Sequence, residues 1–434
     1  PLRNSDPKTT HKLLQPRPGA ACPYIWVIPA YHPCALYTGS SSRCESPCRA
    51  GVVISTAFWY TWGTRSMKRG VLRVAIVHDW LNQIGGAEGV LETLVDMFPG
   101  ATVYTSMYWP EAMPALYGQW DIRTTWVDRL PGIHRHHQPY LLVYPLAFGG
   151  LELRDFDLVI SNKSAFCMGV RTAPGTHHVC YCLTPTRFVW NFDAYVGREQ
   201  VGGLVRSSVR PFLGRLQRWE RAAADRVDAF VAISSAIQGR IQRFYGRESD
   251  IVYPPVDTAR FVPSPDGSHD DYFLIVSRLV PYKRIDLAVQ AFTELGLPLW
   301  IAGSGRDRAS LEAMAGPNIR FLGRVPDEEL GQLMARCRAF IFPGLEDFGI
   351  APVQAMAAGR PVIAFAGGGA LDYVVEGVTG TFFHEQTSRS LADVVSHFDE
   401  AAFVPSAIRA HAEQFDTQLF KSKLMAVIRE HMGA

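Results

Sequence analysis

The sequence lacks the features that define several large classes of protein. Its 43 lysine and arginine residues nearly balance its 41 aspartate and glutamate residues, for a net charge of +2. This balance argues against a general nucleic-acid binder, which needs a basic surface. No apolar run reaches the roughly 20 residues that span a bilayer, and the run from Ala50 to Trp62 is clearly shorter. We find no internal repeats. A hydrophobic content of 47% instead fits a globular protein with large cores.

Zinc-binding spacing is also missing from the eight cysteines. Cys180 and Cys182 lie two positions apart on an expected strand. Because no cysteine and histidine set has metal-ligand spacing, we expect no metal site. Reduced, buried thiols in a cytoplasmic protein are the better interpretation.

The first 66 residues differ in composition from the rest of the chain. They carry seven basic residues against two acidic ones, and four of the eight cysteines. They show no sustained periodicity, whereas Met67 directly precedes a strong expected strand. We therefore interpret residues 1–66 as a poorly structured extension, with the natural start at Met67. The alternative is that Arg49 and the run from Ala50 to Trp62 form a signal-peptide core or an anchor.

From Met67 onward, apolar runs of β-type residues alternate with segments of helical periodicity. This pattern predicts parallel sheets with crossover helices, hence an α/β fold. The expected strands lie near residues 71–77, 101–105, 157–161, 178–182, 228–233, 272–277, 298–302, 319–322, 339–342 and 361–365. A polar linker rich in proline separates two halves. We expect a first domain at 67–260 and a second at 261–415, with a final helix at 416–434 that packs back on the first.

One segment of the second half carries the strongest functional signal. A strand ending at Pro343 delivers an acidic pair, Glu346 and Asp347, to the start of an alanine-rich helix. A second apolar strand follows and ends in three glycines at 367–369. Parallel sheets build ligand sites at the carboxyl ends of their strands, where carboxylates can bind hydroxyls and helix N-termini can bind phosphate. A ligand with both groups is a nucleotide sugar.

Two other turns occupy the equivalent place after a strand. Arg278 and Lys283 follow the first strand of the second half and form a natural pair for a diphosphate, although a solvated basic turn would look the same. Gly85 and Gly86 follow the first strand of the first half. There they let a ligand approach the backbone, or simply pack the strand on its helix.

Gly303 and Gly305 begin a pattern that resembles a dinucleotide-binding fingerprint. The third glycine position is occupied by Arg308, so the pattern fails. We expect these glycines to form a strand-to-helix turn that lines the same crevice.

These motifs occur together in the order seen in one enzyme family. They comprise residues 277–278, 283, 303–305, 321–325 and 346–349 in the second half, and 85–88, 184–190 and 253–257 in the first. In this ordered set, from Met67 to the C-terminus, the chain resembles the retaining glycosyltransferases of family four, in a mannosyltransferase-like branch. The resemblance implies the GT-B architecture, in which two Rossmann-like, doubly wound parallel-sheet domains face each other across a cleft.

The resemblance also implies roles for individual residues. Arg278 and Lys283 would grip the donor diphosphate, and Glu346 would bind hydroxyls of the donor sugar, as the catalytic residues. The other donor-binding positions that it implies are Gly85, Gly86, Gly303, Gly305, Phe348, Gly349, Ile350, Gln354, Gly367, Gly368 and Gly369. Members of the family need no divalent metal and no cofactor, because cationic side chains and helix ends stabilise the leaving group.

Two positions depart from the family's pattern. Gln354 stands where the family has a second glutamate that holds the nucleotide ribose, and Leu183 stands where relatives have a histidine near the reacting carbon. Glutamine can still bind ribose hydroxyls, whereas leucine cannot hydrogen-bond to a sugar. His78, at the end of the first strand, is a candidate ligand contact. Arg187 and Trp190 are candidate contacts for sugar or acceptor, although a packed loop would explain them equally well.

An arginine-rich stretch at residues 203–226 combines helical periodicity with six arginines. Basic amphipathic helices can lie on anionic membranes, but a solvated helix face is the simpler explanation. Acceptors in this branch are often lipid-linked sugars. We therefore expect a cytoplasmic protein, with peripheral contact to the inner face of the plasma membrane through this stretch as an open alternative.

The sequence thus predicts a retaining, metal-independent hexosyltransferase. It would move a sugar, such as mannose from GDP, to a glycan or lipid-linked acceptor in polysaccharide biosynthesis. Leu183 and Gln354 motivate an alternative, a protein that binds nucleotide sugars without turnover. A nucleotide-sugar epimerase of the same fold is a third hypothesis, and we expect no nucleic-acid partner.

Overall fold

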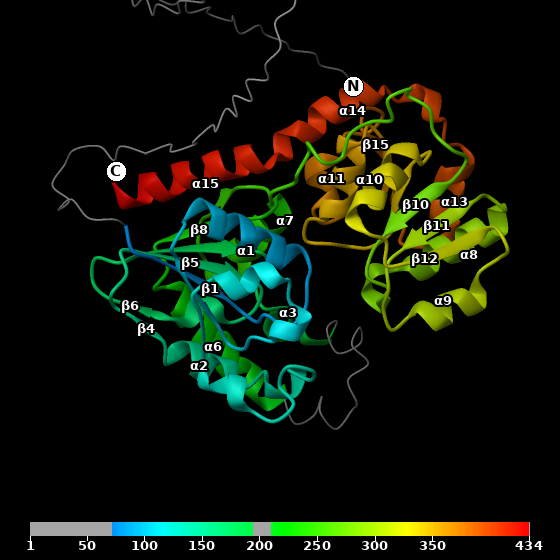
Figure 1. Cartoon of the computed structure of the whole chain (residues 1–434). Helices are drawn as coiled ribbons and strands as arrows, with labels where there is room; N and C mark the ends of the chain where they lie inside the picture. The colour runs from blue at the N-terminus through cyan, green and yellow to red at the C-terminus, as the bar shows by residue number, and fades with distance from the viewer. Residues whose placement is uncertain (1–71, 194–209, 434) are drawn as a thin grey trace, which may run out of the picture. The chain divides into compact units, whose positions relative to one another are not determined.

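The structure, a computed structural model, describes residues 72–193 and 210–433 (Figure 1). These residues belong to one compact unit. The predicted extension at 1–66 lies outside the described residues, as do Arg206 and the other residues of the arginine-rich stretch that precede Arg210.

A seven-stranded parallel sheet forms the first half of the described chain. Its strand order is β3-β2-β1-β5-β7-β8-β9. The strands are β1 (Val74–His78), β2 (Thr102–Thr105), β3 (Ile122–Thr124), β5 (Leu158–Lys163), β7 (His177–Cys182), β8 (Ala229–Ala232) and β9 (Asp250–Ile251). Every residue of β1 and β5 is buried, as expected of central strands covered on both faces. A separate small sheet pairs β4 (Glu152–Leu153) with β6 (Arg171–Thr172).

A six-stranded parallel sheet forms the second half, in the order β12-β11-β10-β13-β14-β15. Its strands are β10 (Phe273–Val276), β11 (Leu299–Ala302), β12 (Ile319–Gly323), β13 (Phe340–Phe342), β14 (Val362–Phe365) and β15 (Gly380–Phe383). The central neighbours β10 and β13 pair in parallel through Leu274 and Phe340. Their following loops therefore leave the sheet at the same edge, which positions the candidate site.

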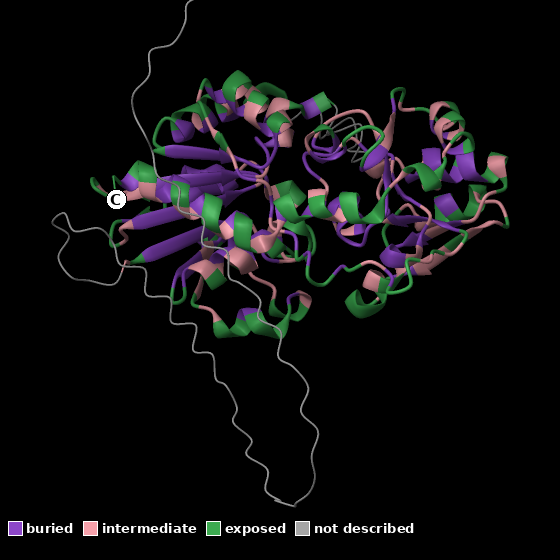
Figure 2. Cartoon of the chain, turned by 90° about the horizontal axis from the view of Figure 1, so that it is seen from above, coloured by how far each residue is buried: buried purple, intermediate pink, exposed green. Residues whose placement is uncertain are grey.

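Helices connect the strands and cover the sheets. In the first half they are α1 (Gly86–Met97), α2 (Tyr144–Gly149), α3 (Arg187–Trp190), α6 (Leu213–Ala224) and α7 (Ser235–Tyr245). In the second half they are α8 (Ile285–Leu295), α9 (Arg308–Met314), α10 (Asp327–Arg336), α11 (Ile350–Ala357), α12 (Ala370–Tyr373), α13 (Ser388–Ser396), α14 (Pro405–Ala412) and α15 (Thr417–Met432). Figure 2 shows buried residues along the strands and exposed residues on the outer faces of the helices.

The prediction of an α/β fold with two doubly wound parallel sheets is confirmed. Each expected strand is present within a few residues of its expected bounds. The sequence pattern missed the short strands β3 and β9 and the strand β15, which lie at or near the sheet edges. Outer strands are covered less completely than central ones, so their sequences carry a weaker apolar run.

The C-terminal helix α15 packs against the first sheet, although it follows the second in the chain. The ring of Phe420 lies edge-on to Tyr181 of β7, with 5.5 Å between ring centroids. Lys421 forms an ion pair with Asp96 of α1. The helix is capped at its start by Asp416, whose carboxylate accepts a hydrogen bond from the backbone N–H of Gln418 at 2.8 Å.

The cysteines within the described residues are all free and buried. They are Cys167, Cys180, Cys182 and Cys337. Burial raises the pKa of the thiols of Cys167, Cys180 and Cys337. Across residues 72–193 and 210–433, no helix is both long enough and apolar enough to cross a membrane.

Candidate functional site

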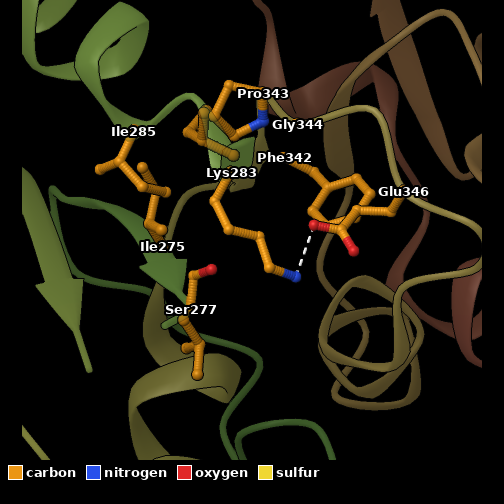
Figure 3. A pocket seen from close by; sticks show the side chains of 10 residues that line it. Ile275, Ser277, Lys283, Ile285, Phe342, Pro343, Gly344 and Glu346 are labelled. Carbon is orange, nitrogen blue, oxygen red and sulfur yellow. Dashed lines mark ion pairs between the residues drawn. The ribbon is translucent and has the colours of Figure 1, made fainter. Parts of the chain in front are cut away.

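The candidate site is built around an ion pair between the two central strands of the second sheet. Lys283 ends the short 3₁₀ turn Pro281–Lys283 after β10, and Glu346 lies in the loop after β13. Lys283 Nζ is 2.5 Å from Glu346 Oε1 (Figure 3). A pocket beside the pair is lined by Ser277 and Phe342, among others. The structure therefore brings together two of the three residues predicted to be catalytic.

Tyr282 connects the third predicted residue, Arg278, to this pair. Arg278 is exposed, and its guanidinium donates a 2.9 Å hydrogen bond to the Tyr282 hydroxyl. Lys283 Nζ lies 5.3 Å from the centroid of the same ring. Arg187, which comes from the first half, has its guanidinium carbon 5.8 Å from that centroid. Tyr282 thus contacts three cationic side chains. Arg278 binds its hydroxyl, and the other two lie near its ring, whose π-face carries partial negative charge.

Asp347 adds a second acidic centre directly beside Glu346. Its carboxylate accepts 2.6 Å and 2.5 Å hydrogen bonds from Arg187 and Arg240, which lie on α3 and α7 of the first half. Burial tends to raise the pKa of Asp347, but the two guanidinium groups outweigh it and the pKa is lowered. In the sequence, Asp347 stood out only as part of the acidic pair, and Arg240 was not predicted.

The loop between Glu346 and α11 mixes core and site residues. Gly349 caps α11 with φ +99°, and a Cβ there would lie 2.5 Å from the ring of Phe342, so the position requires glycine. Phe348 is buried against the ring of Tyr373, with 5.4 Å between centroids, so its side chain packs in the core. Gln354 is half-buried on α11.

The predicted glycine turn of the first half lies close to the start of α11. A Cβ on Gly86 would be 3.2 Å from Cδ1 of Ile350. Gly85 is the N-cap residue of α1. A Cβ on Gly85 would lie 3.2 Å from a carboxylate oxygen of Glu88. The structure therefore places Gly86 and Ile350, both predicted donor-binding residues, side by side.

Gly303 and Gly305 lie directly against the backbone of a neighbouring segment rather than facing open space. Cβ atoms on Gly303 and Gly305 would lie 1.8 Å and 2.1 Å from the carbonyl oxygens of Ser277 and Leu279, on either side of Arg278. These two glycines let the turn after β11 pack against the Arg278 segment.

The glycine run at 367–369 supports the acidic loop in the same way. A Cβ on Gly368 would lie 2.0 Å from the carbonyl oxygen of Glu346, and one on Gly369 would lie 2.3 Å from Cα of Phe348. The N–H of Gly369 donates a 2.9 Å hydrogen bond to that Glu346 carbonyl. Gly367 faces the side chains of Leu345 and Phe365.

His78 and Trp190 have protein partners that account for their positions. His78 is buried, with Nε2 3.4 Å from Glu88 Oε1 and Nδ1 3.2 Å from the Asn162 amide nitrogen. Trp190 stacks on Phe244 and donates a 2.6 Å hydrogen bond from its indole N–H to Glu220. Their contacts with a ligand stay predictions.

Leu183 is half-buried and packs against the largest hydrophobic core. Among the residues that the structure describes, no group of three or more histidine, cysteine, aspartate or glutamate side chains could hold a metal ion.

The fold and this site define a class of protein, a two-sheet α/β protein with paired cations and carboxylates at the strand ends of its second sheet. Two adjacent family models match it. The one described as Glycosyltransferase Family 4 covers residues 84–260, and the one described as Glycosyl transferases group 1 covers residues 259–401. The chain belongs to this glycosyltransferase family.

Curated relatives are similar at modest identity. A GDP-mannose-dependent alpha-(1-6)-phosphatidylinositol monomannoside mannosyltransferase of Mycolicibacterium smegmatis is 30% identical over 191 residues, which are 37% of this chain and 50% of the relative. The D-rhamnosyltransferase WbpZ of Pseudomonas aeruginosa is 31% identical over 144 residues, 31% of this chain and 38% of the relative. The chain thus spans about half or less of the length of these relatives.

Solved structures support the fold over a larger part of the chain. The Anabaena protein Alr3699/HepE, in complex with UDP, has a TM-score of 0.61 at 18% identity, covering 83% of this chain and 100% of that one. Sucrose-phosphate synthase from Thermosynechococcus elongatus has a TM-score of 0.60 at 15% identity, covering 82% and 99%. These similarities show that the chain has the fold of these proteins.

Proposed function

We propose that the chain is a retaining glycosyltransferase that moves a hexose from a nucleotide-diphosphate sugar to a glycan or lipid-linked acceptor. The observation that carries this proposal is the pairing of Lys283 with Glu346 at the shared edge of β10 and β13. A cation and a carboxylate at one sheet edge offer complementary groups to the phosphates and the hydroxyls of such a donor. Family membership supports the same activity.

The charges near the site suit a diphosphate. Four cationic side chains lie near the site against two acids. Lys283 pairs with Glu346, and Arg187 and Arg240 bind Asp347. Arg278 contacts the Tyr282 hydroxyl instead. The surplus of positive charge would stabilise the departing nucleotide diphosphate, whose negative charge grows as the glycosidic bond breaks. In this proposal Lys283 and Arg278 stabilise the negative charge of the departing diphosphate, and Glu346 orients the sugar hydroxyls.

The proposed mechanism is front-face displacement within an ion pair. The bond from the anomeric carbon to the diphosphate oxygen breaks, and the acceptor hydroxyl oxygen bonds to the same face of that carbon. The acceptor's proton passes to the departing phosphate oxygen, so no enzyme nucleophile is needed. We propose that the cationic side chains replace a divalent metal and that no cofactor takes part.

The donor that we propose is GDP-mannose, because relatives similar to this chain are named as GDP-mannose-dependent mannosyltransferases. Thermal unfolding with a panel of GDP and UDP sugars tests this choice. A donor at one hundred times its Kd stabilises the fold by about 2.7 kcal/mol. A shift with GDP-mannose and none with UDP sugars is expected; the reverse pattern would reject the proposed donor.

Leu183 and Gln354 favour a second candidate, a sugar-nucleotide binding protein with little turnover. Leu183 packs against the core and cannot hydrogen-bond to a donor sugar. Calorimetry combined with an assay for nucleotide release separates the two candidates. Binding of GDP-mannose with release of GDP in the presence of acceptor supports the transferase, and binding without release supports the second candidate. Conversion of the sugar without acceptor would indicate an epimerase.

We further propose that α6 contributes to contact with anionic membranes, where lipid-linked acceptors lie. Arg215 and Arg218 are exposed on α6, and Phe212, just before it, is 43% exposed. By contrast, Arg221 and Arg226 donate to the carbonyl oxygens of Phe244 and Gly169, which lie outside α6, so they have a packing role. The hydrogen bond of Arg218, to the carbonyl oxygen of Gly214 at 3.3 Å, stays within α6. Sedimentation with phosphatidylglycerol vesicles tests the proposal. Arg215→Glu with Arg218→Glu should abolish binding, and equal binding by the double variant would refute it.

A further inference from the structure

A buried ion pair lies behind the short helix that carries Arg187. Lys163, at the end of β5, and Glu220, on α6, have no exposed side-chain surface, and Lys163 Nζ is 3.0 Å from Glu220 Oε1. Removing two charges from water is costly, and apolar residues of similar size are often at least as stabilising. A contribution to stability therefore does not explain this pair, and its other contacts show what it holds in place.

The pair fixes the chain on both sides of Arg187. The Thr186 hydroxyl, immediately before α3, is 2.5 Å from Glu220 Oε1, and the Trp190 indole N–H, at the end of α3, donates to Oε2 at 2.6 Å. Lys163 adds a 3.2 Å hydrogen bond to the carbonyl oxygen of Thr184. One buried carboxylate thus binds both ends of a helix of only four residues, which is too short to be stable alone.

Arg187 points from this helix toward the candidate site. Its guanidinium donates to the carboxylate of Asp347 at 2.6 Å and lies 5.8 Å from the centroid of the Tyr282 ring. Asp347 is the neighbour of Glu346 in the chain, and Tyr282 is the neighbour of Lys283. Arg187 therefore contacts the residue adjacent to each member of the central ion pair.

We propose that the Lys163–Glu220 pair is a positioning element for the donor site, and that it acts through Thr186 and Arg187 on the loop of Glu346. This inference rests on the proposed function for its catalytic consequence, but not for its structural one. Small displacements of groups that orient a substrate cost rate, because alignment of the reacting atoms is lost.

The test compares substitutions of two residues whose hydroxyls both bind the Glu220 carboxylate, Thr186 beside α3 and Tyr245 on α7. Thr186→Val removes the hydroxyl next to Arg187 and keeps the side-chain shape, whereas Thr186→Ser keeps the hydroxyl. Tyr245→Phe is the matched control, because the Tyr245 hydroxyl also donates to Glu220 Oε1, at 2.9 Å, but from α7. Arg240 on α7 should keep its position, since Ser234 caps that helix independently.

With GDP-mannose as donor, Thr186→Val should lower kcat roughly 10- to 100-fold with a smaller change in KM. Thr186→Ser and Tyr245→Phe should stay near wild type. In an Arg187→Met background, Thr186→Val should cause no further loss, because its effect passes through Arg187. Equal losses in Thr186→Val and Tyr245→Phe, or an additive loss in the Arg187→Met background, would overturn the proposal.

A second measurement needs no activity. Urea unfolding of Arg187→Met, Asp347→Asn and the double variant gives the coupling between these two side chains. Thr186→Val should abolish that coupling, and Tyr245→Phe should preserve it. Unchanged coupling in Thr186→Val refutes the positioning role. If the coupling behaves as expected while the wild-type protein neither binds nor turns over any of the GDP and UDP sugars, the proposed function fails and the positioning role stands.

Discussion

Single residues of the candidate site are linked chiefly through Tyr282. Its hydroxyl accepts from Arg278, and its ring lies near Lys283 and Arg187. Nothing in the sequence singles out a tyrosine between two basic residues, since such a turn looks the same when it is merely solvated. The structure gives it a role, because its ring attracts the cations of Lys283 and Arg187, which would otherwise repel one another.

Lys283 and Glu346 should each be needed for sugar transfer. Lys283→Met removes the charge proposed to stabilise the leaving diphosphate, and Glu346→Gln removes the carboxylate proposed to orient the sugar. We expect each change to lower kcat by roughly 100-fold or more, the scale seen when a preorganised electrostatic group is lost. Initial rates of GDP release from GDP-mannose with acceptor measure the effect.

Arg154→Ala is the control for this experiment, because Arg154 pairs with Glu152 at 2.9 Å on an exposed surface. Such a pair contributes at most about 1 kcal/mol, so activity and melting temperature should stay near wild type. Wild-type rates in Lys283→Met or Glu346→Gln would refute the assignment of the site.

His178 should make stability depend on pH. It is fully buried on β7, its Nε2 is 2.7 Å from the Ser161 hydroxyl, and burial lowers its pKa to about 4. In the unfolded chain its pKa is roughly 6.5, so the unfolded state takes up a proton first as the pH falls. Stability should therefore decrease from about pH 6.5 down to about pH 4, by roughly 3 kcal/mol in all.

Urea unfolding of the wild type and His178→Gln at several pH values measures this contribution. The variant lacks the titrating group, so its free energy of unfolding should fall less across the same window. Parallel pH profiles for the two proteins would show that His178 does not cause the effect.

At the scale of elements, the sequence predicted the central strands well, but it did not predict which helix residues contact the loops at their ends. The apolar runs of β1, β5 and β10 predicted buried strands, because strands covered on both faces are mostly apolar. Lys283 and Glu346 were predictable because each follows such a strand. Arg240 was not, since it lies within α7 and is a residue of ordinary type for an amphipathic helix.

The glycine run before α12 has a packing role that the sequence did not reveal. Gly367 to Gly369 were predicted to bind the donor, which stays a prediction, and in the structure Gly368 and Gly369 pack against the backbone of the Glu346 loop. Both roles are compatible with glycine, because each needs a residue without a side chain. Only the pairing of the two loops in space distinguishes them.

Gly369→Ala should displace the acidic loop. Gly369 has φ −69°, which alanine adopts freely, so the effect is steric: the new methyl would lie 2.3 Å from Cα of Phe348. We expect a loss of roughly 1–3 kcal/mol, the usual cost of overpacking, together with weaker donor binding. Urea unfolding and a thermal shift with GDP-mannose measure the two effects.

Gly239→Ala provides the comparison, since Gly239 lies within α7 and nothing lies within 4 Å of its added Cβ. Alanine should stabilise this helix by about 1 kcal/mol. If Gly369→Ala behaved like Gly239→Ala, the close packing of the two loops would be wrong.

At the scale of the whole described chain, one hydrophobic core includes residues from both halves. It contains Tyr181 of β7, Phe340 of β13 and Phe420 of α15, together with the aromatic residues Phe348 and Phe415. The return of α15 to the first sheet is part of this continuity. The two halves should therefore not unfold independently.

Phe420→Ala should test this continuity. Phe420 is 2% exposed, so its truncation should cost roughly 3–5 kcal/mol of unfolding free energy. Fluorescence and circular dichroism should lose signal together at one lowered midpoint, as expected of a cooperative transition. Leu419→Ala is the neighbouring control, because Leu419 is 42% exposed and should change stability by less than about 0.5 kcal/mol. Two separate transitions would contradict the expectation.

The buried cysteines can report local opening of the structure to solvent. Cys180 lies on β7 and Cys337 directly follows α10, and burial raises the pKa of both thiols. A thiol reacts with iodoacetamide only as thiolate and only when reagent reaches it. The rates at which iodoacetamide alkylates these two side chains, measured by peptide mass spectrometry, would therefore report how often the surroundings of each cysteine open to solvent, without any engineered probe.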